Sequence, residues 1–553
     1  MSEDRQAAGS QELPSTQTGE ATPPSAGARL PGRRAFLVGT GGLAAAALVG
    51  PGGRWSRSEQ TTSAGATATQ PSGSGFPLDL EARRARALEL RITTAQQQLR
   101  DPFPRPAPNG DEDRYDIVGL ANFTKALPHN DLGEVDPAAY RALLRALRSG
   151  RSADFTRIPL GGSLKLANPE GAFSFELQGP DPWQRPLAAP PALNSEAFAG
   201  EMTECYWLAL ARDVPYRRYG QEPTTAAAVA DLRGFADYQG LDARTLFRST
   251  DPRLPGVSTG PYVSQFLLAP YTFGSTPIEQ RYRTTVAGSD HLTSYPAWLA
   301  VQNGQPTGAT ARYDPTPRFI RNGRDLGEWS HRDFSYQGPL VAALILLDYL
   351  ARYGRKVLAD TNPYRDHPTQ TGVVTFGAPD ILDQVARSAN AAMKAAWYHK
   401  WLVHRRLRPE ETGGRVHHHL TGAANYPFHR KLTDSPVLER LYSTHGSYLC
   451  PQAYPEGCPT HPAYPGATAA IGGAGMRVLQ AFFNPNFVIP EPVVPTDDGL
   501  SLRRYTGGPL TVGGELNKLA FNMAFGRDTA GVHFRRDELE GIVRGECDYC
   551  SFP

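Results

Sequence analysis

The sequence predicts a mostly α-helical protein whose helices are joined by long, ordered loops. Several extended segments are rich in helix-forming residues or show an amphipathic pattern. No sustained alternation of apolar and polar residues marks β-strands, and the 49 prolines lie mostly between the helical segments. We therefore expect helices to form the core.

Three helices are expected in the first part of the folded region. Residues 78–99 are rich in Arg, Ala, Glu, Leu and Gln, which favour helix. Pro137 opens a clear amphipathic segment, and Asp136 precedes it as an N-cap. Residues 196–210 form the next helix.

Four more helices are expected toward the C-terminus. Residues 339–353 are apolar on nearly every face, which places that helix inside a bundle. Residues 380–408 contain few helix breakers and predict one long helix. Residues 466–483 and 532–545 predict the last two.

Composition narrows the class of protein. The 57 basic and 55 acidic residues give a net charge of +2, without the concentrated basic excess of a nucleic-acid-binding protein. We expect a small-molecule substrate and no nucleic-acid partner.

The first 76 residues differ from the rest and predict a leader with a disordered segment, followed by one large helical domain over 77–553. They are rich in Ser, Thr, Gly, Ala and Pro, and they contain Arg33-Arg34 before a short apolar run. This pattern is typical of a twin-arginine export signal, and the run is too short and glycine-broken for stable membrane insertion. The alternative is a disordered tail on a cytoplasmic protein.

Five cysteines are too few for a disulfide scaffold in 553 residues. Cys450 and Cys458 flank a proline-rich loop and are either free thiols or a local disulfide. Cys547 and Cys550 have no second pair of ligands for zinc at matching spacing. Cys205 is expected to be buried.

Three separated segments predict a pocket for a tetrahedral oxyanion. They run from Lys400 to Arg408-Pro409, from His461 to Gly466-Ala467-Thr468, and from Arg527 through Gly531 to His533. Arginine forks and a lysine hold such an anion through charge-assisted hydrogen bonds.

Helix geometry predicts the relative positions of only some of these side chains. On one continuous helix, Lys400, His404 and Arg408 share a stripe, although a solvated basic face gives the same pattern. Six residues separate Arg527 from His533, so both cannot lie on one helical face, and Gly531 is expected to break the chain between them. His533 then lies near the N-terminus of the last helix.

The three segments resemble the vanadium-dependent haloperoxidases, including the bacterial chloroperoxidase-like members. The family's pattern has Lys, Arg-Pro eight positions on, His-Pro-x-Tyr-Pro-Ser-Gly-His, and Arg with His six positions on. Lys400, Arg408, Arg527 and His533 fall on its anion-holding positions, and His533 matches the residue that bonds vanadium. The resemblance extends from about Asp101 to the C-terminus through residues 122–134, 201–215, 319–323 and 511–520.

The resemblance implies two packed four-helix bundles of the haloperoxidase and acid phosphatase type in a homodimer. The chain departs from the pattern where Gly466-Ala467-Thr468 replaces Ser-Gly-His. A hydroxyl that holds vanadate and an imidazole that assists peroxide chemistry are thereby absent. We expect the anion-binding pocket to include Gly466, Ala467 and Thr468, to stay electropositive, and to be roomier than in the family.

These substitutions favour a non-redox enzyme of the isomerase type. The chain resembles a napyradiomycin-pathway homologue that performs an α-hydroxyketone rearrangement, a prenyl 1,2-shift, on a naphthoquinone meroterpenoid. Lys400, Arg408 and Arg527 would stabilise an enolate or alkoxide, and His461 would remove a proton. No cofactor is expected, although the pocket admits vanadate or phosphate.

The alternative is a vanadium-dependent chloroperoxidase or bromoperoxidase that halogenates a meroterpenoid with hydrogen peroxide. Phosphate-ester hydrolysis and simple anion binding are weaker alternatives. Further contacts with an aromatic, prenylated substrate are predicted from Trp401, His404, His417 and His419. No metal ligand is expected unless vanadate binds at His533.

Overall fold

The computed structural model describes residues 79–100, 105–177, 181, 184 and 187–549. The chain divides into two compact units, Met1–Arg84 and Ala85–Pro553. The predicted leader and Cys550 lie outside the described residues, so export and the leader boundary stay predictions.

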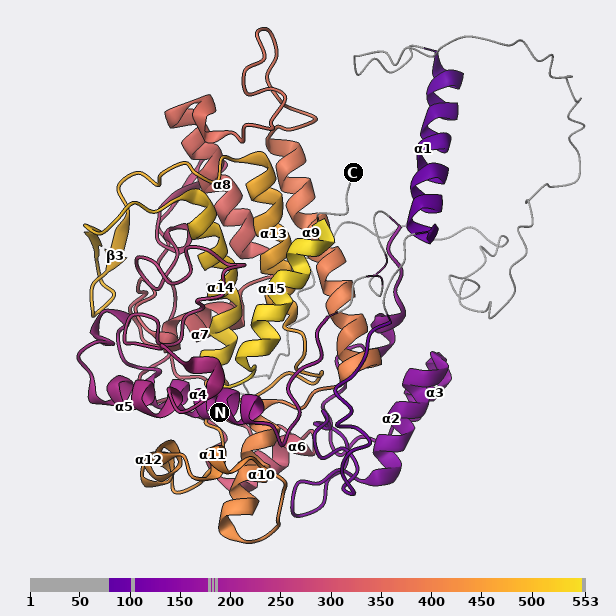
Figure 1. Cartoon of the computed structure of the whole chain (residues 1–553), viewed down its shortest axis with the longest axis vertical. Coiled ribbons are helices and arrows are strands. Elements are labelled where there is room, and N and C mark those ends of the chain that lie inside the picture. Colours follow the sequence, from indigo (N-terminus) through magenta and orange to yellow (C-terminus); the bar gives the residue numbers. More distant parts are fainter. Residues whose placement is uncertain (1–78, 101–104, 178–180, 182–183, 185–186, 550–553) are drawn as a thin grey trace, which may run out of the picture. The chain divides into compact units, whose positions relative to one another are not determined.

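Helices dominate the described chain, as the sequence predicts (Figure 1). The α-helices are α1 (Leu80–Arg100), α2 (Pro137–Ser149), α3 (Ser152–Thr156), α4 (Glu196–Ala211), α5 (Pro223–Leu232), α6 (Tyr295–Gln302), α7 (Gly323–Arg332), α8 (Gln337–Tyr353), α9 (Ala378–Tyr398), α10 (Pro409–Thr421), α11 (Arg430–Thr433), α12 (Pro436–His445), α13 (Ala467–Phe482), α14 (Val512–Thr529) and α15 (Arg535–Tyr549). Short 3₁₀ segments cover Pro169–Phe173, Tyr216–Arg218, Ala236–Tyr238, Gln265–Leu267 and Arg355–Val357.

Strands are confined to two small antiparallel hairpins within the described chain. One pairs β1 (Tyr271–Phe273) with β2 (Thr276–Ile278), and the other pairs β3 (Val493–Pro495) with β4 (Leu502–Arg504). Each strand has three residues, so neither hairpin forms a layer of the core.

The larger unit has a central bundle made by α8, α9, α13, α14 and α15, with α7 packed on α14 (Figure 1). A second group of helices, α5, α11 and α12, surrounds α4, which also contacts α14. Thirteen of the residues of α4 are buried, consistent with a helix enclosed by neighbours on most sides. No single described helix is long and apolar enough to cross a membrane, although α7 and α8, which meet at 97°, reach that length together.

The predicted helix caps and ends are largely observed. Asp136 accepts a hydrogen bond from the backbone N–H of Ala139 at the start of α2, and α8 and α13 match their predicted bounds closely. Gly531 has a φ of 82°, a left-handed conformation that suits glycine, and it separates α14 from the segment that carries His533.

The prediction of one helix over residues 380–408 is wrong. Helix α9 ends at Tyr398, a π-helical turn covers His399–His404, and Arg405 has a left-handed φ of 44°. The Arg405 side chain forms an ion pair with Glu112, and its backbone carbonyl accepts a hydrogen bond from the Phe123 N–H (2.8 Å). Pro409 then begins α10, and Arg408 is its extended N-cap residue.

Glycines allow α13 and α15 to approach closely. A β-carbon on Gly473 would collide with the carbonyl oxygen of Ile542 and lie 2.8 Å from its carbonyl carbon. A β-carbon on Gly541 would lie 2.7 Å from the carbonyl oxygen of Gly466. This close packing sets the distance between the second and third motif segments.

We expect Gly473→Ala to destabilise the protein, because the added methyl group meets backbone that cannot move aside. The expected loss is about 1–3 kcal/mol in the free energy of unfolding, measured by urea denaturation. Gly508→Ala is the control, since nothing lies within 4 Å of the position that its methyl group would take. Equal stability of the two variants would contradict the packing argument.

Candidate oxyanion site

The structure brings together the ends of three chain segments, as the motif spacing predicts. Arg408, at the N-cap of α10, reaches both other segments. Its guanidinium donates to the His461 carbonyl (2.9 Å) and the Val532 carbonyl (2.7 Å), and it lies 3.1 Å from Nε2 of His533. A second guanidinium nitrogen lies 2.9 Å from Nδ1 of His461. Arg408 therefore joins the two candidate histidines.

Lys400 enters the same region from the π-helical turn. Its ammonium group is fully buried and donates to the carbonyl oxygens of Pro462 (2.9 Å) and Ala463 (2.6 Å). Burial and the nearby charge of Arg408 lower the pKa of Lys400 well below its usual value. Burial also lowers the pKa of Arg408. Among the described residues, no carboxylate is hydrogen-bonded to the side-chain cation of either residue.

The orientation of His533 is set by a buried carboxylate. Asp537 Oδ2 lies 3.0 Å from Nδ1 of His533 and accepts a 3.0 Å bond from the Phe534 N–H. Its other oxygen accepts from Arg406. These donors hold the pKa of Asp537 far below its usual range against the opposing effect of burial. Nδ1 of His533 is therefore the protonated nitrogen, and Nε2 presents its lone pair toward Arg408.

The surroundings of both histidines favour the neutral imidazole. Burial lowers the pKa of His533 well below 6.5, with Arg408 adding to the effect. Burial followed by the charges of Arg408 and Lys400 does the same to His461. The His461 ring also packs against Trp397, with the ring centroids 4.8 Å apart.

The space beside Gly466 is not open, contrary to the expectation of a roomier pocket. Glu538, in the first turn of α15, places its carboxyl group against the Cα of Gly466. A β-carbon on Gly466 would lie 2.8 Å from Cδ and 2.9 Å from Oε1 of Glu538. Burial, with the neighbouring Asp537 carboxylate, raises the pKa of Glu538, whereas Lys400, Arg527 and Arg408 lower it.

Gly466 is the N-cap residue of α13, and its backbone N–H donates to the carbonyl oxygen of Asp537 (2.8 Å). Ala467 and Thr468 follow in the first turn of that helix. The N–H of Gly466 is thereby used within the protein and does not point freely into the pocket.

Arg527 lies on α14 at the side of the pocket. One of its guanidinium nitrogens lies 3.6 Å from Oδ1 of Asp333, and its Nε has no hydrogen-bond partner. Burial raises the pKa of Asp333 to about 6, although the charges of Arg527 and His331 oppose this. Arg527 is thus a partly exposed cation whose charge acts on Glu538, as do those of the buried Lys400 and Arg408.

The predicted substrate contacts are placed elsewhere. Trp401 is fully buried and packs edge-on against Phe123, at 5.8 Å between ring centroids. His404 lies between His399 and Tyr464. His417 and His419 lie on α10, where they accept backbone hydrogen bonds from Tyr448 and Tyr426. None of the four forms a hydrogen bond with the pocket residues described above, so their assignment as substrate contacts is not supported by position.

Sequence reasoning missed three carboxyl groups of the site, those of Asp333, Asp537 and Glu538. Asp537 could have been predicted from the sequence, because a carboxylate four residues after His533 at a helix start can reach the imidazole ring. Glu538 could not, since its contact with Gly466 depends on how closely α13 approaches α15. Cys205, Cys450 and Cys458 are free and buried, which settles the local disulfide alternative in favour of thiols.

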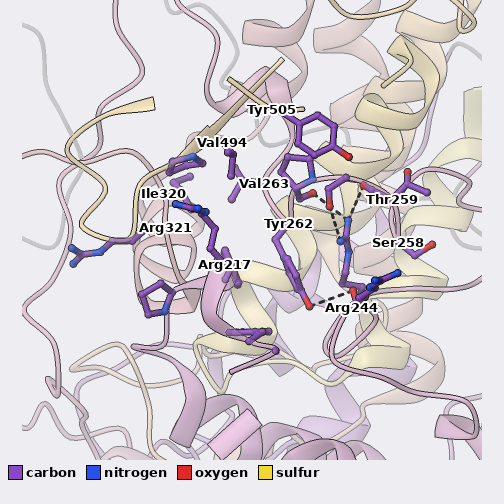
Figure 2. A pocket seen from close by; sticks show the side chains of 18 of the residues that line it. Arg217, Arg244, Ser258, Thr259, Tyr262, Val263, Ile320, Arg321, Val494 and Tyr505 are labelled. Atoms are coloured by element: carbon purple, nitrogen blue, oxygen red, sulfur yellow. Dashed lines mark hydrogen bonds between the residues drawn. The ribbon is translucent and has the colours of Figure 1, made fainter. Parts of the chain in front are cut away.

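A separate cavity of about 800 Å³ lies at another part of the surface (Figure 2). Tyr262 and Tyr505 stand at its wall. Arg248 also lines it, but its guanidinium is bonded to the carbonyl oxygens of Val257 and Gly260 and holds that loop together. None of the oxyanion-site residues lines this cavity.

We expect Asp333→Asn to stabilise the protein more at pH 7.5 than at pH 4. The folded-state pKa of Asp333 lies above the unfolded value, so the folded state loses stability as pH rises from about 4 through 6. A shift of roughly two pKa units corresponds to at most about 3 kcal/mol. Urea unfolding at both pH values measures the difference.

The exposed Asp366→Asn variant serves as the control for Asp333→Asn, because 92% of the Asp366 side chain is accessible. A change in stability at Asp333→Asn that is equal at the two pH values would contradict the assignment.

Comparison with known proteins adds to this geometry. No family model matches the chain. The chain is 36% identical over 459 residues to a vanadium-dependent bromoperoxidase of Ascophyllum nodosum, covering 77% of this chain and 80% of the relative. It is 30% identical over 534 residues to a vanadium-dependent bromoperoxidase of Corallina officinalis, covering 79% and 87%.

A solved structure matches over most of its length. This is the homohexameric second vanadate-dependent bromoperoxidase of Ascophyllum nodosum, with a TM-score of 0.81 and 30% identity over 89% of this chain and 88% of that one. The match confirms the predicted fold type. The predicted homodimer stays a prediction.

These relatives correct one prediction. The expectation that no cofactor is needed is contradicted, because each of the three is named as vanadium- or vanadate-dependent. They also favour the halogenating alternative over the rearrangement.

Proposed function

Because the chain belongs to the vanadium-dependent bromoperoxidase family, we propose that it binds vanadate at the oxyanion site and uses hydrogen peroxide to halogenate an organic substrate. The observation that carries the proposal is the buried His533 imidazole, with Nδ1 fixed by Asp537 and Nε2 facing the guanidinium of Arg408. The substrate class that we propose is aromatic and prenylated, with bromide as the halide.

The residues present fit vanadate in three respects. His533 offers an unprotonated nitrogen, as a metal ligand must. A carboxylate behind the ring fixes its tautomer and raises its basicity. Two buried cations and one partly exposed cation match the charge of an oxyanion. Bound vanadate would supply Lewis-acid activation of peroxide toward the halide.

The protein's own groups have separate roles in this proposal. Arg408 orients His533 and His461 at the same time, because its fork reaches both rings. Lys400 and Arg527 would supply further positive charge to the anion. His461, kept neutral by its surroundings, accepts a proton at the pocket edge beside Trp397, where an aromatic substrate would stack.

Thr468 lacks the imidazole that the family's pattern has at its position. A hydroxyl does not exchange protons near neutral pH as imidazole does, and each lost hydrogen bond to a charged group is typically worth about 1.5–3 kcal/mol. We therefore expect a high vanadate requirement and a slow turnover.

The α-hydroxyketone rearrangement is the second candidate. The neutral His461 beside Arg408 favours it, because a base next to a cation suits removal of a hydroxyl proton with charge developing on the adjacent oxygen. The two candidates differ in their need for peroxide and halide.

We expect bromination of a phenolic dye by the full chain with orthovanadate, hydrogen peroxide and bromide, and a fall of about 100-fold or more in kcat/KM in Arg408→Lys. A lysine cannot reproduce the two-sided fork that contacts both histidines, and losses of this size are usual when a positioned donor is removed. The exposed Arg217→Lys variant is the control.

Conversion of a prenylated hydroxynaphthoquinone in the absence of peroxide and halide would favour the rearrangement instead. Bromination by wild type and Arg408→Lys at equal rates would contradict the role given to this site.

A further inference from the structure

We propose that Glu538 is the side chain that contacts the bound oxyanion in place of the serine hydroxyl of the family's pattern. The inference deepens the proposed function and rests on its premise that this pocket binds an oxyanion. It concerns which residue of this chain completes the pocket where Gly466 provides no side chain.

The position of Glu538 is the first support. Its carboxyl group fills the volume that any side chain at position 466 would need, with Cδ 2.8 Å from the β-carbon position of Gly466. A serine there would occupy the same space. Gly466 and Glu538 together therefore present one polar side chain to the pocket, carried by α15 instead of α13.

The second support is the absence of an internal partner among the described residues. The Glu538 side chain is 2% exposed, and neither carboxyl oxygen makes a hydrogen bond. Nδ1 of His533 lies 3.5 Å from Oε1 of Glu538, and that nitrogen already donates to Asp537. Buried carboxyl groups are almost always hydrogen-bonded in native proteins, so this one is expected to find its partner in a bound group.

The surrounding charges indicate what that group is. The cations acting on Glu538 are Lys400, Arg527 and Arg408, and the opposing carboxylate is Asp537. Two buried cations in this set bond only to carbonyls or histidine, which leaves net positive charge for an anion. Vanadate and phosphate near neutral pH carry hydroxyl groups, so one proton shared between anion and carboxyl satisfies both, whichever of them carries it.

The experiment measures binding of orthovanadate to the full chain by calorimetry, with inorganic phosphate as a second probe. In Glu538→Ala we expect a Kd raised about tenfold or more, the effect of one lost charge-assisted hydrogen bond. In Glu538→Gln we expect a Kd within about threefold of wild type, because the carboxamide keeps both a donor and an acceptor.

A reciprocal pair of variants separates this role from a purely structural one. Gly466→Ser alone should weaken binding, because the hydroxymethyl group collides with Glu538. Adding Glu538→Ala to Gly466→Ser should return the Kd to within about threefold of wild type, since the hydroxyl then takes the vacated place. Glu540→Ala, on the same helix but paired with Arg253, is the control and should bind as wild type.

Unchanged or tighter anion binding in a folded Glu538→Ala variant would overturn the assignment, as would a double variant no better than Gly466→Ser. If Glu538→Ala does not fold, the double variant and Glu538→Gln decide. If anion binding depends on Glu538 but the protein does not brominate the dye, only the proposed function is contradicted. If the protein brominates the dye but anion binding does not depend on Glu538, only this inference is contradicted. If the wild type binds neither anion at millimolar concentration, both are contradicted.

Discussion

The buried carboxylate of Asp537 is the interaction on which the site depends, because it connects all three motif segments. Its side chain accepts hydrogen bonds from Arg406 (2.6 Å) and His533 (3.0 Å), and its carbonyl oxygen accepts from Gly466 (2.8 Å). Arg406 in turn pairs with Glu201 of α4, which ties the second helical group to the bundle. Removing one member of such a buried pair commonly costs about 3–5 kcal/mol, so the pocket and the fold are stabilised by the same contacts.

This arrangement leaves part of the positive charge in the pocket without a neutralising carboxylate. Asp537 is used by Arg406 and His533, so it does not neutralise Lys400 or Arg408 directly. Their pKa values are lowered by burial, which means that the folded protein holds cations at a free-energy cost. An oxyanion would offset that cost, and a substrate that develops negative charge would do so transiently. The positive charge of the pocket therefore favours binding of anions in general. The reaction that follows depends on the neighbouring histidines.

Much of this could be predicted from the sequence, because local patterns determine it. Helix propensity and caps located seven of the fifteen described α-helices, and the resemblance of the three motif segments to a known family predicted that Lys400, Arg408, His461 and His533 lie together. The end of α9 could not be predicted, since the segment that follows it contacts residues distant in the chain, among them Glu112 and Phe123, which bond to Arg405.

The remaining errors have the same physical origin in tertiary contacts. His417 and His419 follow the motif in sequence, yet their rings accept backbone hydrogen bonds from Tyr448 and Tyr426 and make no hydrogen bond with the pocket residues. The room expected beside Gly466 is filled by Glu538, a residue brought there only by the close approach of two glycine-lined helices. The residues of one segment do not predict which side chains of another helix will pack against it.

The number of residues in the π-helical turn at His399–His404 affects the positions of the side chains in and around it. A π turn holds one residue more than an α turn, so the residues on its two sides keep a register that an ordinary helix would rotate by about 100°. Before the turn, Ala392 and Ala396 of α9 pack against Ala470 of α13, and within it Lys400 reaches the carbonyls before Tyr464. Shortening the turn by a single residue would satisfy one of these contacts only by abandoning the other.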